Sequence, residues 1–315
     1  MSVNVKEPSS IASALLTQGI LAPSAHNTQP WLAEVEDEAL TLLPDRSRQL
    51  RADTLGREMF ISLGCFWGNV RLAADSLGIH IKEDFVADGV RIVVEKQSGR
   101  ARDDPILEAI RSRRHNRFPL TGPFDFRTEA KSGDLEVRVV TDPELRKAIA
   151  AVTAEAFKKQ LRDRAFRTEF AEWLRPNAGS ATDGIPGYAL GFPAPLARIM
   201  PTIIKRFSMA GPISRRERSL MQSAPAVCLI SGPDDERGWI TAGRVFEELA
   251  ISAEQQGYQC AINAAPIEID TSAGELARLV GMQRPLVLFR IGRPTKLTRA
   301  TPRRPLADIT RTTQS

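Results

Sequence analysis

The sequence predicts an α+β fold made of two related halves. Apolar residues at helical spacing alternate with short strand-like segments along all 315 residues, which exceed the ~100–200 residues of a typical domain. Residues 70–78 and 249–257 also share one plan, an apolar helix that ends at a glycine and leads into strand-like sequence. We interpret this similarity as an internal repeat and expect the halves to join near residues 98–105.

The composition is that of an ordinary folded protein, with 42% apolar and 26% charged residues. No apolar run approaches the ~18 residues of a membrane span, and the N-terminus lacks the basic and apolar regions of a secretory signal. Cys65, Cys228 and Cys260 are widely spaced, which favours buried, reduced thiols. We therefore expect a cytoplasmic protein with no membrane partner.

The charge pattern favours a small anion as a partner. Net charge is +5, from 43 Lys and Arg against 38 Asp and Glu, and arginines cluster separately at residues 111–117, 215–218 and 299–304. Separate clusters suit an anion at one point better than a continuous nucleic-acid track, so we expect no nucleic-acid partner. Each cluster could equally be a solvated face. With three histidines and no paired cysteines, we expect no metal site.

In the first half, apolar spacing predicts a helix over residues 11–21, with Ser9 or Ser10 as its N-cap. Alternation over residues 32–43 predicts two short strands around an acidic turn. A very apolar helix follows over residues 54–77, and Gly78 is a natural stop for it. Residues 90–94 read as a strand, and the charged segment 98–104 is the expected seam.

The second half shows the same alternation of helical and strand-like patterns. We expect helices over residues 106–113, 141–174 and 239–256, and strands over residues 135–140, 226–231 and 285–291. Thr141 with Glu144, and Ser272 with Glu275, have the spacing of helix capping boxes. The helix after Ser272 is expected to end near Gly281. The basic tail around residues 303–306 reads as extended.

Residues 176–212 have a different character. Glycines and prolines punctuate the segment, and an apolar piece lies at residues 196–204. The segment is too long for a simple loop and too apolar for a disordered linker, so we interpret it as a lid. An ordinary helical insertion explains it equally well.

A polar loop at residues 21–31 stands between the first helix and the first strand. Ser24, Asn27, Thr28 and Gln29 are packed between two prolines and followed by a tryptophan. Amide side chains offer both donors and an acceptor, which suits the edge of a heteroaromatic ring. A plain helix-to-strand loop could have the same composition.

With these motifs, the chain resembles the nitroreductase-like family of FMN proteins, most closely its single-chain Acg-like branch. The resemblance is carried, in order, by residues 22–31, 113–118, 239–257, 290–294 and 302–306. It implies a mixed sheet flanked by helices in each half, and halves that pack as a built-in pseudo-dimer. The halves would span residues 1–100 and 101–315, with the lid inserted at about 176–212.

The resemblance also implies one FMN held across the two halves. Its ring and ribityl groups would contact Ser24, Asn27 and Gln29. Its phosphate would be held by Arg113, His115 and Arg117, assisted by Arg303 or Arg304. A phosphomonoester carries about −1.5 to −2 charges, and arginine forks bind it bidentately, which agrees with this assignment. The histidine departs from the family's usual Ser or Thr and could instead point to solvent.

The implied function is an FMN-dependent NAD(P)H oxidoreductase acting as a monomer on a nitroaromatic, a quinone or a similar acceptor. The alternative is a flavin-sequestering protein whose lid excludes donors. No catalytic proton donor can be named from the sequence. Ser24 and His26 lack a third partner for a hydrolytic triad, and Gly-rich phosphate loops are absent.

Overall fold

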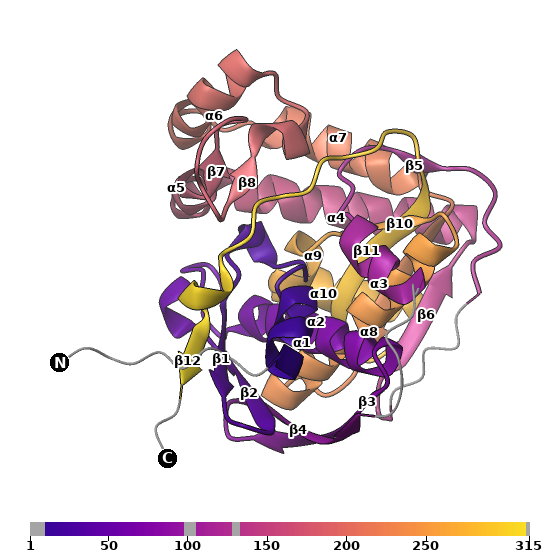
Figure 1. Cartoon of the computed structure of the whole chain (residues 1–315). Helices are drawn as coiled ribbons and strands as arrows, with labels where there is room; N and C mark the ends of the chain where they lie inside the picture. The colour runs from indigo at the N-terminus through magenta and orange to yellow at the C-terminus, as the bar shows by residue number, and fades with distance from the viewer. Residues whose placement is uncertain (1–9, 98–104, 128–132, 313–315) are drawn as a thin grey trace.

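The computed structural model describes residues 10–97, 105–127 and 133–312, within which a pair of β-sheets encloses a layer of helices (Figure 1). The first sheet has the order β12-β1-β2-β4-β3 and the second has the order β10-β11-β9-β6, with β5 paired to β11. All of these neighbours are antiparallel except β1 and β12. The expected mixed α+β fold is confirmed.

The strands are β1 Trp31–Val35, β2 Ala39–Pro44, β3 Ile79–Val86, β4 Gly89–Gln97, β5 Leu120–Thr121, β6 Glu136–Val140, β7 Leu174–Arg175, β8 Ile185–Pro186, β9 Ala226–Ser231, β10 Gln259–Ile262, β11 Pro285–Pro294 and β12 Thr310–Thr312. The α-helices are α1 Ser10–Gly19, α2 Arg57–Ser76, α3 Pro105–Ser112, α4 Pro143–Arg162, α5 Arg164–Glu172, α6 Ala194–Arg206, α7 Ala210–Ser223, α8 Glu236–Gln255, α9 Ala265–Glu268 and α10 Asp270–Val280. Short 3-10 turns are η1 Ala25–Asn27, η2 Arg46–Arg48, η3 Gly187–Leu190 and η4 Leu306–Asp308.

Helices α2 and α8 pack against each other at the centre of the helical layer, with their backbones in close approach. A Cβ on Gly64 would lie 1.9 Å from the Ile240 carbonyl oxygen, and one on Gly243 would lie 2.0 Å from the Ile61 carbonyl oxygen. Only glycine permits this contact. Each helix leads, through a glycine with positive φ, into a strand, as the internal repeat predicts.

The sequence of strand β9 does not alternate between apolar and polar residues because both of its faces are covered. Its odd and even side chains enter different cores: Cys228 packs toward the central helices, whereas Val227 and Leu229 pack toward α4 and α10. Both faces of the second sheet are therefore covered, and every residue of the strand is buried. Cys65, Cys228 and Cys260 are buried and unbridged, so the expectation of buried thiols is confirmed.

Three local predictions were wrong. The helix expected over residues 141–174 is broken at Asp163, whose side chain accepts a hydrogen bond from the Ala165 amide and starts α5. The cap of α4 is Asp142, which accepts from the Leu145 amide at 2.7 Å, so the expected Thr141 box does not form. Ser272 lies inside α10, because that helix already begins at Asp270.

The C-terminal tail also returns to the start of the chain. After an extended stretch it forms β12, which pairs in parallel with β1. The sequence did not predict β5 or β12. The capping serine Ser9 and the seam at residues 98–104 lie outside the described residues.

Helices α5, α6 and α7 lie at the top of the molecule as drawn in Figure 1, with β7 and β8 between them. The apolar piece at residues 196–204 forms most of α6, and its inner side chains make a small core with those of α5, β7 and β8. None of the helices in the described ranges combines the length and apolarity needed to traverse a bilayer.

Candidate functional site

A cavity of about 420 Å³ is lined by segments that are far apart in the sequence. The 21–27 loop and α2 form one wall, residues 110–117 and β10–α9 another, and α4 to α7 together with residues 298–303 complete it. Six of the eight predicted site residues line it: Ser24, Asn27, Arg113, His115, Arg117 and Arg303. This volume lies within the range of small-molecule and cofactor sites.

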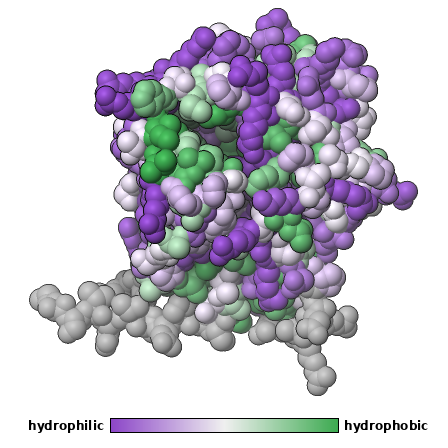
Figure 2. Space-filling model, turned by 90° about the horizontal axis from the view of Figure 1, so that it is seen from above, coloured by the Kyte–Doolittle hydropathy of each residue, from purple (hydrophilic) through white to green (hydrophobic). Residues whose placement is uncertain are grey.

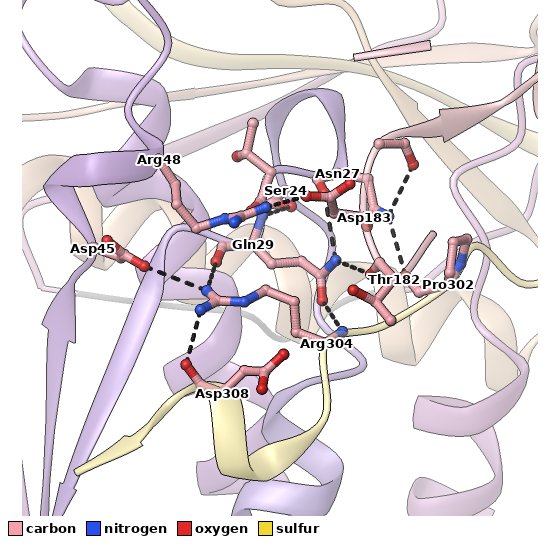
Figure 3. Close-up of polar contacts among 12 residues, drawn as sticks. Ser24, Asn27, Gln29, Asp45, Arg48, Thr182, Asp183, Pro302, Arg304 and Asp308 are labelled. Carbon is pink, nitrogen blue, oxygen red and sulfur yellow. Dashed lines mark hydrogen bonds and ion pairs between the residues drawn. The ribbon is translucent and has the colours of Figure 1, made fainter. Parts of the chain in front are cut away.

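Gln29 and Arg304 lie outside the cavity lining, in a network shown in Figure 3. The Gln29 side chain is wholly buried; its Nε2 donates to the Thr182 carbonyl at 2.8 Å, and its Oε1 accepts from the Arg304 amide at 2.8 Å. The Arg304 guanidinium donates to the Gln29 carbonyl at 3.0 Å and pairs with Asp45. These bonds fasten the loop to the tail and to the 176–212 segment.

The backbone of the loop explains why its polar side chains diverge. His26, Asn27 and Gln29 all have φ near +50°, a conformation that non-glycine residues rarely adopt. The side-chain amide of Asn27 donates through Nδ2 to the carbonyls of Gly184 and Pro302, at 3.0 and 3.1 Å. Ser24 Oγ accepts from the Gln29 amide at 2.9 Å and can still donate its own hydroxyl hydrogen.

Arg113 and Arg303 form a cationic end of the cavity. Both guanidinium groups donate to the Leu21 carbonyl, at 2.6 and 2.9 Å, and Arg113 Nε lies 2.9 Å from Glu247 Oε1 of α8. Burial raises the pKa of Glu247 to about 7, although the Arg113 charge opposes this shift. Burial and the nearby Arg113 lower the pKa of Arg303 to about 9. Two guanidinium groups thus share one carboxylate, and positive charge remains for an anion.

Arg117 belongs to a different group of charges. Burial lowers the pKa of Arg117 to about 10, partly offset by Glu217, while Arg216 lies close enough to donate to the Arg117 carbonyl at 3.0 Å. Arg290 is almost fully buried and is held by the carbonyls of Phe118 and Asn116. The arginines predicted to hold the phosphate therefore fall into two groups. Arg113 and Arg303 lie near Glu247, whereas Arg117 lies near Glu217.

His115 lies between these two groups. Burial, together with the positive charges of Arg117, Arg290 and Arg113, holds the pKa of the His115 ring well below the ordinary value. The ring is therefore neutral near pH 7, and its Nδ1 accepts from the Ile262 amide at 3.4 Å. His115 lines the cavity.

A carboxyl pair lines the same cavity and was missed by sequence reasoning. Glu58 comes from α2 and Glu268 from α9, and the Gln160 side chain donates to Glu268 Oε2. Burial, followed by the charge of Glu268, holds the pKa of Glu58 well above the usual range. No local pattern could have connected these residues, because they meet only through the packing of distant helices.

The covering helices add an aromatic wall. The His26 ring lies 5.2 Å from the Phe170 ring between centroids, and Phe166 stacks on Phe170 at 6.4 Å. Met200 and Ile204 of α6 continue this wall. Seen from above, hydrophobic residues gather beside a hollow in the surface (Figure 2). Among the residues that the structure describes, no His, Cys, Asp or Glu cluster of three or more suits a metal ion.

Comparisons with known proteins extend these observations. No family model matches the chain. It is 26% identical to the Acg protein of Mycobacterium tuberculosis, provisionally named an NAD(P)H nitroreductase, with 91% of each chain covered. A second M. tuberculosis protein with a provisional NAD(P)H nitroreductase name is 28% identical, covering 88% of this chain and 83% of its own.

The solved structures that match the chain are more distant in sequence. The FMN-dependent nitroreductase NfnB of Mycobacterium smegmatis, in complex with NADPH, is 16% identical over 67% of this chain and 98% of its own, with a TM-score of 0.41. The NADPH:FMN oxidoreductase of Vibrio harveyi, in complex with NAD+, is 14% identical over 67% of this chain and 78% of its own, with a TM-score of 0.40.

Proposed function

Since the chain is related along nearly its whole length to the Acg-like nitroreductases, as its motifs indicated, we propose that it is an FMN-dependent NAD(P)H oxidoreductase. Its acceptor would be a nitroaromatic, a quinone or a similar small molecule. The observation that carries the proposal is the pair Arg113 and Arg303, which both interact electrostatically with Glu247 at one end of a cofactor-sized cavity. FMN, when bound, supplies the hydride chemistry.

The unfilled hydrogen-bonding groups of the cavity fit this cofactor. Arg303 Nε is buried and has no hydrogen-bond partner among the described residues, which suits a phosphate oxygen. Asn263 Oδ1 is likewise buried without a partner there, which suits an N–H group at the edge of a flavin ring. Ser24 can donate its hydroxyl to the ribityl chain. We assign Gln29 and Arg304 to the scaffold, because their polar atoms are used within the chain.

The division into halves is also proposed. Residues 1–100 and 101–315 would form the two nitroreductase-like halves of a monomeric pseudo-dimer, with β12 returning to the first sheet. The packing of α2 on α8 and the matching helix–glycine–strand units support this division. A single chain would then build a complete cofactor site.

Residues 176–212 would act as the lid. Three contacts with the first half support this role: Asn27 to the Gly184 carbonyl, Gln29 to the Thr182 carbonyl, and Arg48 with Asp183. The aromatic side chains beneath would exclude water from the flavin. A tightly held lid also favours the second candidate, a flavin-sequestering protein with little reductase activity.

Titration of the cofactor-free protein with FMN tests the cofactor. We expect one FMN per chain and a yellow protein. Arg303→Ala should weaken binding by about 1.5–3 kcal/mol, as for a lost hydrogen bond to a charged group. Arg278→Ala, which removes an exposed arginine on α10, is the matched control and should bind normally. A protein that binds no FMN at all would refute the proposal.

Anaerobic stopped-flow mixing of the FMN-loaded protein with NADPH or NADH separates the two candidates. Rapid loss of the oxidised-flavin absorbance is expected for the oxidoreductase. Flavin that stays oxidised at saturating concentrations of both donors would establish sequestration instead.

A further inference from the structure

The carboxyl pair formed by Glu58 and Glu268 gives the cavity an acidic side, which the binding of FMN does not explain. The two side chains line one cavity from different elements, and the charge of Glu268 helps to raise the pKa of Glu58. Two adjacent carboxyl groups repel each other when both are ionised, which favours a proton on one of them. Gln160 donates to Glu268 Oε2, so this oxygen acts as an acceptor. Burial and the charge of Glu268 hold the pKa of Glu58 well above its usual range, which makes Glu58 the member that holds the proton.

The charges around Glu58 support this assignment. Asp53, at the start of α2, and Glu169 of α5 add further negative charge, and each contributes to the raised pKa of Glu58. Their own oxygens accept from backbone amides: Asp53 from Met59, and Glu169 from Arg51 and Ala52. The neighbouring cations pair with other carboxylates, Arg51 with Glu169 and Glu172, and Arg57 with Asp234.

The neighbouring Arg57 independently marks this region of the cavity as a place for a ligand. Its side chain is 8% exposed and belongs to the cavity lining, and its Nε is buried without a hydrogen-bond partner in the described ranges. A ligand with an acceptor oxygen would satisfy this donor. An oxygen of a nitro or quinone group has that property.

The histidines and the thiol of the cavity cannot replace Glu58 as an acid near pH 7. Burial lowers the pKa of His26 to about 4 and holds the pKa of His115 still further from neutrality, so both rings are unprotonated. Burial also raises the pKa of Glu217, although three guanidinium groups oppose this shift. Burial raises the pKa of the Cys65 thiol well above its usual value, which makes it a very weak acid.

We propose that Glu58, paired with Glu268, is the catalytic acid that protonates the acceptor as it is reduced in this cavity. The inference rests on the proposed oxidoreductase function. For a quinone, one oxygen gains the Glu58 proton as the Glu58 O–H bond breaks, and the hydride comes from the nicotinamide donor by way of the cofactor. The hydroquinone leaves with two added hydrogens, and water reprotonates Glu58, because two adjacent carboxylates repel each other.

The first test needs no cofactor. Infrared spectra of the protein at pH 7 should contain the carbonyl stretch of a carboxylic acid from Glu58, and Glu58→Gln should remove that component of the band. Glu155→Gln, at an exposed position of α4, is the control and should leave the band unchanged. A band of the same intensity in Glu58→Gln as in the wild type, or no such band in the wild type, would overturn the proposal whether or not the protein uses FMN.

The second test uses the FMN-loaded protein, reduced and then mixed with a soluble benzoquinone over a range of pH. The wild-type oxidation rate should fall as pH rises past the pKa of Glu58. In Glu58→Gln, flavin oxidation should be slower by about 10²–10⁴-fold and should no longer show this fall with pH, while FMN affinity and reduction by NAD(P)H stay normal. Glu268→Gln removes the charge that raises this pKa, so the fall in rate (the alkaline limb of the pH profile) should move to lower pH.

The outcomes separate the two proposals. Equal oxidation rates in wild type and Glu58→Gln, or an unmoved limb in Glu268→Gln, would refute the role of the carboxyl pair and leave the oxidoreductase standing. Failure of the wild type to bind FMN, or to be reduced by either nicotinamide, would refute the proposed function itself.

Discussion

At the scale of single residues, His26 carries the clearest dependence on pH. Its ring packs against Phe170, and its backbone has φ of +49°. Burial, assisted by the charge of Arg117, lowers its pKa from 6.5 to about 4. The unfolded chain therefore binds the proton more readily than the folded chain between these two values.

This difference predicts acid sensitivity. The stability contributed by neutral His26 is fully present above about pH 6.5 and is lost as pH falls toward 4, because protonation favours the unfolded state. His26→Asn, which tolerates the same backbone conformation, removes the effect. We expect the unfolding free energy of wild type minus that of the variant to fall over this range in urea titrations. Buried carboxyls such as Asp53 act with the opposite sign but are common to both proteins. A difference that does not change with pH would contradict the prediction.

At the scale of elements, the packing of α2 against α8 depends on two glycines. Gly64→Ala and Gly243→Ala would each drive a methyl group into the carbonyl of the other helix. Backbone atoms cannot move aside as a flexible side chain can, so each change should cost about 1–3 kcal/mol of unfolding free energy. Gly274→Ala is the control, because nothing lies within 4 Å of its Cβ position in α10. There the gain in helix propensity should stabilise the protein by up to about 1 kcal/mol. Equal effects at the three sites would refute the close approach.

The start of α4 offers a second test at this scale. Asp142 accepts from the Leu145 amide, whereas Thr141, the cap expected from the sequence, is one residue too early. Asp142→Ala should destabilise the protein by about 1 kcal/mol, and Thr141→Ala should change it by less than about 0.5 kcal/mol. The opposite order in thermal unfolding would show that the capping box forms after all.

At the scale of the whole molecule, the cofactor and the fold should stabilise each other. The proposed site draws on the first loop, the central helices and the C-terminal tail, so FMN bound there favours the folded chain. At a free concentration of 100 times Kd the expected gain is about 2.7 kcal/mol, seen as a rise in Tm. Arg303→Ala should need proportionally more FMN for the same rise, and Arg278→Ala should match wild type. A Tm that is independent of FMN would contradict the site.

Much of the fold could be predicted from local sequence patterns. Helices α2 and α8 end where Gly78 and Gly257 supply positive φ, and the apolar runs of β9 and β11 mark strands that are buried on both faces. Such signals depend on neighbours in the sequence. The break at Asp163 was not predictable in the same way, because an acidic residue within a long helical pattern is common and its capping role appears only in the folded backbone.

The candidate site likewise combines features that the sequence predicts with features that depend on tertiary packing. The sequence by itself determined the mixed α+β class, the polar loop at residues 21–31, the arginine clusters and the similarity to Acg-like proteins. Only the tertiary structure decided that Gln29 and Arg304 bond to each other outside the cavity, that Glu247 lies beside Arg113, and that Glu58 meets Glu268. Residue type and spacing specify what a segment can form and bind. The packing of α2, α8 and the tail decides which distant side chains share a cavity. Buried charges need partners, and the folded core determines which groups lie beside them.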